Sequence, residues 1–152
     1  MNPGTLVLAA ILVLPAAGAL VLALISDDRK GGWLNAFVSF LTFVCALLLL
    51  IERPASGPYL IVDDLNAVFI ILSTLVGFTT AVFSASYIAH ELETGHLTHA
   101  HLRFYHAMYQ MLMFGMNLAL LSNNVGLMWV AVELATLTTV VMVGRCVTRA
   151  RS

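Results

Sequence analysis

Five apolar runs, separated by short polar segments, divide the chain. A helix that crosses a membrane needs about 20 mainly apolar residues, each adding about 1.5 Å. The last two runs belong to one long stretch, which the turn-forming residues Ser122, Asn123 and Asn124 interrupt. The pattern predicts an all-α integral membrane protein, a bundle of about five transmembrane helices forming a single domain over residues 1–152. The expected spans are residues 5–26, 33–51, 65–89, 104–122 and 125–143, followed by a basic tail at 144–152.

The distribution of lysine and arginine predicts the orientation of the bundle. Five spans place the two termini on opposite sides of the membrane. With the N-terminus outside, Arg53 is the only basic residue on the outer side, and the other basic residues all face inward. Lysine and arginine accumulate in cytoplasmic loops, so we expect an outer N-terminus and an inner C-terminus. The inner basic residues are then Arg29, Lys30, Arg103, Arg145, Arg149 and Arg151.

Composition supports the membrane assignment and excludes several other classes of protein. The chain is 61% hydrophobic and 10% charged, whereas soluble domains are about 25% charged. A net charge of −1 leaves no electrostatic footprint for nucleic acid. Two cysteines, Cys45 and Cys146, make neither a disulfide framework nor a metal knuckle. The cysteines therefore indicate neither a disulfide nor a metal site.

A polar segment between the third and fourth expected spans is rich in histidine. Its spacing is not a standard zinc-ligand pattern, because zinc sites need three or four ligands in a defined geometry. We interpret it as a titratable surface segment, and a metal site is the less favoured alternative. Its potential ligands are His90, Glu91, Glu93, His96, His99 and His101.

Glu133 is the one charged residue near the middle of an expected span. A charge at the centre of a membrane helix costs about 2.5–3.5 kcal/mol on insertion scales. The other acidic residues lie in loops or at span ends. Intramembrane acids commonly serve proton relays or ion sites, so we predict that Glu133 belongs to a proton relay or an ion-binding site. The alternative is a protonated acid that only hydrogen-bonds a neighbouring helix. Thr136, about one turn later, shares its helix face and could donate a hydrogen bond to it.

Three polar residues form a stripe on the fourth expected span. His106, Gln110 and Asn117 are four and seven residues apart, which places them on one helix face. One interpretation is a hydrated proton path that leads from the inner surface toward Glu133, with Thr136 beside it. The alternative is a set of interhelical hydrogen bonds, which polar residues in membranes commonly make.

The second half of the chain resembles a known family. The resemblance rests on residues 86–88, 104–110 and 123–137, above all on the Asn123-Asn124 turn that leads into Trp129-Val130-Ala131 and Glu133. These segments resemble the proton-translocating, antiporter-like membrane subunits of complex I, Mrp-type antiporters and group 4 [NiFe]-hydrogenases. The greatest similarity is to the component F type of hydrogenase 4 and formate hydrogenlyase. The first two expected spans match this family only in hydropathy.

The resemblance implies a location, a set of partners and a role for one residue. It implies a multi-pass protein of a bacterial inner membrane, associated with other antiporter-like subunits and a redox or hydrogenase arm. Glu133 would match the family glutamate that pairs with a lysine on a later helix during proton transfer. The subunit itself would bind no cofactor and no metal ion, and would perform no redox chemistry.

The chain also departs from the family pattern. Family members have about fourteen spans, whereas this chain has five expected spans and no lysine after Lys30. We therefore expect either a fragment of a proton-translocating subunit or a chain whose partner supplies the missing lysine. The alternative function is a structural subunit that contributes only helix packing, or a non-functional shortened gene product.

Overall fold

The computed structural model describes residues 3–25, 28–52, 54, 57–93 and 99–149, with side chains omitted at 28–29, 87–93, 99–101 and 145–149. The described residues form five helices and no β-strand, only an isolated bridge between Leu60 and Ser122. The helices are α1 (Pro3–Leu24), α2 (Asp28–Leu48), α3 (Asp64–Glu93), α4 (His99–Leu121) and α5 (Val125–Arg149). Each expected span overlaps one helix, and the predicted all-α fold is confirmed.

Four of the five helices are long and apolar enough to cross a membrane. These segments are Pro3–Leu24, Lys30–Leu48, Asp64–Ser86 and Val125–Gly144. With 23 residues, α4 is also long enough, but its polar stripe makes it less hydrophobic than the others. The chain is thus a multi-pass membrane protein in which the most polar helix is α4.

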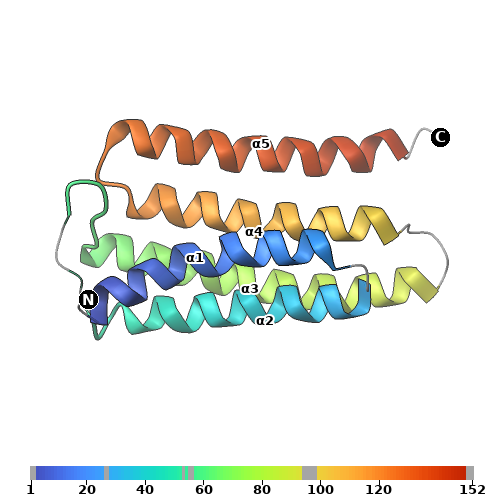
Figure 1. Ribbon diagram of the computed structural model, residues 1–152, viewed down its shortest axis with the longest axis horizontal. Helices are drawn as coiled ribbons and strands as arrows, with labels where there is room; N and C mark the ends of the chain where they lie inside the picture. The colour runs from blue at the N-terminus through green and yellow to red at the C-terminus, as the bar shows by residue number, and fades with distance from the viewer. Residues whose placement is uncertain (1–2, 26–27, 53, 55–56, 94–98, 150–152) are drawn as a thin grey trace.

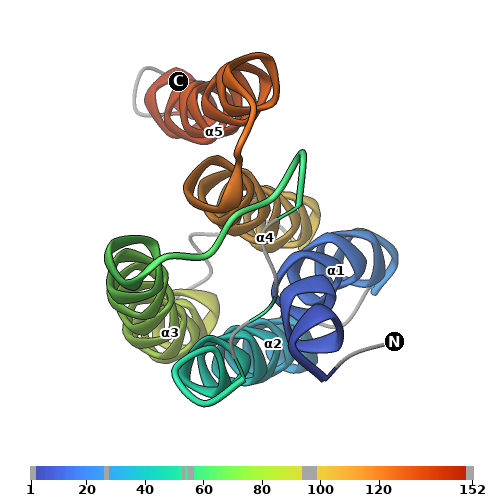
Figure 2. The ribbon, with the colours of Figure 1, turned by 90° about the vertical axis from the view of Figure 1, so that its left-hand side faces the viewer.

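Helices α1 to α4 pack side by side as a group, and α5 stands outside that group (Figures 1 and 2). Among the described residues, α5 contacts α4 and no other helix. The apolar interior of the group is centred on Ile11, Leu49, Ile70 and Leu121, all of which are almost completely buried. The fifth helix therefore has only one neighbour, and most of its surface is uncovered.

The turn between α4 and α5 is fixed by the segment that joins α2 to α3. That segment crosses the end of the bundle (Figure 2) and bonds the turn through its backbone. The amide of Ile61 donates to the carbonyl of Leu121 over 2.9 Å, and the amide of Asn123 donates to Tyr59 over 2.8 Å. The side-chain amide of Asn123 also donates to the Gly57 carbonyl. These bonds hold the start of α5 against the four-helix group.

Side-chain caps define where α3 and α5 begin. The Oδ1 atom of Asn124 accepts hydrogen bonds from the amides of Gly126 and Leu127, at 2.9 and 3.3 Å. At α3, Oδ1 of Asp63 accepts from the amide of Asn66 over 2.7 Å. Such caps satisfy amides that have no partner within the helix. Asp63 therefore has a structural role at the start of α3.

Replacing Asp63 by alanine should lower the free energy of unfolding by about 1 kcal/mol, because an amide in the first turn of α3 loses its acceptor. The matched control is Asp63→Asn, which keeps a capping oxygen and should stay close to the parent chain. Denaturant titration in a mild detergent, followed by circular dichroism, measures both variants. Equal destabilisation by alanine and asparagine would mean that the charge of Asp63 matters rather than its cap.

Candidate functional site

Glu133 lies near the middle of α5 and is exposed in this chain. Ala131, two residues earlier, is fully buried against α4. Two residues correspond to about 200° around a helix, so Glu133 lies on the side of α5 that faces away from α4. Its exposed surroundings are apolar: Trp129, Leu137 and Val140 are all more than half exposed. The carboxyl group thus lies on a mainly apolar outer surface, with the exposed Thr136 beside it.

This surface is poorly suited to lipid contact. An ionised acid at mid-membrane depth is costly to insert, and α5 has no described neighbour on that side. Intramembrane acids almost always face a bundle interior or a water-filled cavity. Among the described helices, none provides such an interior for Glu133.

Thr136 lies beside Glu133 but uses its hydroxyl within its own helix. Its Oγ1 atom donates to the carbonyl of Val132 over 2.9 Å. Both Val132 and Thr136 line a mainly apolar groove between α3, α4 and α5, with a volume of about 490 Å³. The groove adjoins the part of α5 that carries Glu133, on its α3 side.

The predicted stripe on α4 is a single buried face. His106, Gln110 and Asn117 are each at most 1% exposed. The side-chain amide of Gln110 donates to Oδ1 of Asn35 over 2.8 Å and to Oγ of Ser39 over 3.0 Å, both on α2. The stripe thus faces the interior of the α1–α4 group, whereas Glu133 lies on the outer side of α5. A proton route that joins the two remains a prediction.

Asn35 and Ser39 are site residues that the sequence analysis missed. Together with Thr42 they recur at intervals of four and three residues within an otherwise apolar run. This spacing places all three on one face of α2, the same signal that identified the stripe on α4. The spacing of polar residues on α2, set beside the stripe on α4, therefore predicts that the two helices pair through these faces.

Close packing of small residues joins α5 to the rest of the bundle. A Cβ atom added to Gly115 would lie 3.2 Å from the carbonyl oxygen of Ala131 and 3.2 Å from the amide nitrogen of Ala135. Small residues at such a crossing let two membrane helices approach closely. We therefore predict that the orientation of Glu133 away from α4 depends on Gly115.

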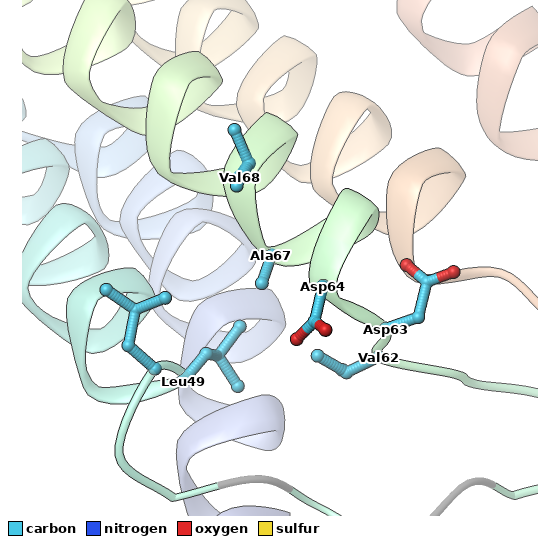
Figure 3. A pocket seen from close by; sticks show the side chains of 7 residues that line it. Leu49, Val62, Asp63, Asp64, Ala67 and Val68 are labelled. Atoms are coloured by element: carbon cyan, nitrogen blue, oxygen red, sulfur yellow. The ribbon is translucent and has the colours of Figure 1, made fainter.

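A small cavity of about 130 Å³ lies where α2 ends and α3 begins. Figure 3 shows the carboxylate of Asp64 turned toward Leu49 and Val62, whereas Asp63 points away from the cavity. No residue of α5 lines this cavity, and Asp63 caps the start of α3 instead. The histidine-rich segment from His90 to His101 lies outside the described side chains.

Comparison with known proteins finds one close sequence similarity. Over 136 residues, or 90% of its length, the chain is 57% identical to the hydrogenase-4 component F homolog of Methylacidiphilum infernorum (isolate V4). The match spans 29% of that relative. The predicted similarity to component F of hydrogenase 4 is therefore confirmed. No protein-family model matches the chain, and no solved structure matches it.

Proposed function

We propose that this chain is part of a proton-translocating, antiporter-like membrane subunit in a group 4 hydrogenase or a related complex I-like assembly. Glu133 is the residue that takes part in proton transfer. The single observation that carries the proposal is an acidic side chain near the middle of the apolar segment Val125–Gly144, on a side of α5 with no described neighbour. The similarity to a hydrogenase-4 component F homolog supports the choice of assembly.

Polypeptide outside these 152 residues completes the proton-transfer site. A carboxylate in a membrane is stabilised by a basic group or by water, and this chain has no lysine after Lys30. The relative is more than three times as long as the segment matched here. We propose that a helix beyond the matched segment, or from a partner subunit, covers the outer side of α5 and brings the lysine that the resembling family uses. Side chains of that helix could pack into the groove beside Val132 and Thr136.

The proposed setting is a bacterial inner membrane, with other antiporter-like subunits and a hydrogenase arm as partners. This chain would bind no cofactor of its own, and redox catalysis would reside in the arm. The role of the chain is then to move protons in response to electron transfer elsewhere in the assembly.

A structural packing role is the second candidate. Two observations favour it: the close α4–α5 crossing at Gly115 and the hydrogen bonds that Gln110 makes to α2. Both are interactions that hold helices together without moving an ion. In this case Glu133 would serve as a hydrogen-bonding contact to a partner subunit.

The two candidates are separated by measuring transport and electron transfer in the same preparation. The assembled complex, with and without this chain, is reconstituted into vesicles, and proton movement is followed with a pH-sensitive dye during turnover. The proposal expects electron transfer to persist while proton movement is lost when the chain is absent. Full proton movement by an assembly that lacks the chain contradicts the proposal. Loss of assembly itself favours the packing role.

A further inference from the structure

Two polar stripes face each other inside the four-helix group. On α2 the stripe consists of Asn35, Ser39 and Thr42, which are at most 2% exposed. On α4 it includes Gln110 and Asn117, which are fully buried. The two helices contact one another and run in the same direction (Figure 1). We call these five residues the polar seam.

Hydrogen bonds between the helices use only part of the polar seam. The amide nitrogen of Gln110 donates to Oδ1 of Asn35 and to Oγ of Ser39. The hydroxyl of Ser39 in turn donates to the carbonyl of Asn35 over 2.9 Å. The hydrogen bonds of the Gln110 amide group therefore fix one end of the polar seam.

Four polar atoms of the seam have no hydrogen-bond partner within the described part of the chain. They are Nδ2 of Asn35, Oε1 of Gln110, and both Nδ2 and Oδ1 of Asn117. Buried polar atoms are almost always satisfied, since each unsatisfied one costs about 1–3 kcal/mol. The buried hydroxyls of Thr42 and Thr74 donate to carbonyls of their own helices instead.

The unsatisfied atoms include both donors and acceptors, and this identifies the chemistry of their partner. A cation would satisfy the two oxygens and leave the two amide nitrogens unpaired. An anion would do the reverse, and no charged side chain of the seam would balance either ion. Water both donates and accepts, and a buried water typically makes two to four hydrogen bonds.

We propose that the polar seam binds water molecules between the side-chain amides of Asn35, Gln110 and Asn117. This site goes beyond the proposed function, because it lies on the other side of α4 from Glu133. Asn117 is two residues from Gly115, the residue that contacts α5, and two residues turn the helix by about 200°. The chain thus has a hydrated seam in its N-terminal helices that does not depend on α5.

X-ray hydroxyl-radical labelling of the full chain in detergent tests this site. Radicals form from water, so a buried side chain is oxidised only where water lies beside it. Met113 is 5% exposed and lies between Gln110 and Asn117 along α4, which makes it the reporter. Met128, which is 43% exposed on α5, is the internal reference. We expect Met113 to be oxidised in the parent chain, and its lack of oxidation would overturn the proposal without any variant.

The matched variant is Asn117→Leu, which keeps the branched shape of the side chain and removes both amide heteroatoms. We expect oxidation of Met113 relative to Met128 to fall about tenfold, because apolar cavities stay dry. Helix content and elution volume check that the variant folds, and Asn117→Ser, which retains one hydroxyl, should give an intermediate value. Equal oxidation in the parent and leucine chains overturns the assignment of the water to Asn117. Oxidation that changes with the concentration of sodium, potassium or chloride overturns water in favour of an ion.

Discussion

Replacing Glu133 by glutamine should reduce the rate of proton translocation by the assembled complex by about 10²-fold or more, the usual contribution of a positioned acid or base. Glutamine has nearly the same size and shape as glutamic acid but cannot release a proton. Glu133 is exposed in this chain, so the substitution leaves no cavity in the bundle. We therefore expect the loss to appear in transport rather than in folding.

The measurement is dye-monitored proton movement in vesicles that contain the complete assembly, with electron transfer measured in parallel. Glu133→Asp is the matched control, because it keeps a carboxyl group on a shorter side chain and should retain part of the transport. Native gel electrophoresis establishes that each variant enters the assembly. Unchanged translocation by Glu133→Gln would contradict the role of this residue, even if the chain proves essential for assembly.

The helices were predictable because charges and turn residues separate the apolar runs. The third expected span, residues 65–89, lies within α3, which extends from Asp64 to Glu93. The second span was expected at 33–51, whereas α2 begins at Asp28. A helix keeps its backbone hydrogen bonds beyond the apolar region, so helix ends and hydrophobic limits do not coincide. The limits of the spans in the membrane remain predictions.

The orientation of the site was harder to predict than its residues. Helical spacing placed His106, Gln110 and Asn117 on one face, and all three are buried. Spacing within one helix does not reveal which neighbour that face meets, and Gln110 bonds α2. The outward position of Glu133 was equally hidden, because α5 is apolar on nearly all sides around it. Pairing between helices had to be known before either direction could be assigned.

Replacing Gly115 by leucine should separate α5 from α4. A Cβ atom alone would lie 3.2 Å from backbone atoms of Ala131 and Ala135, and backbone does not move aside as a flexible side chain does. Overpacking of this kind costs about 1–3 kcal/mol. Since α5 has no other described neighbour among the helices, only the hydrogen-bonded turn at its start would still hold it to the group. We expect the helix to remain formed while its position relative to the four-helix group becomes variable.

Pulsed electron paramagnetic resonance measures this displacement between spin labels at Val68 on α3 and Val130 on α5, after replacement of Cys45 and Cys146. Both label positions are more than half exposed, so the labels should leave the packing intact. The parent chain should give a narrow distance distribution, and Gly115→Leu a broad one with a longer mean. Gly144→Leu is the matched control, because a Cβ atom at Gly144 meets nothing within 4 Å. An unchanged distribution for Gly115→Leu would show that the turn at Asn123 and Asn124 holds α5 in place, and the orientation of Glu133 would then depend on that turn rather than on the Gly115 crossing.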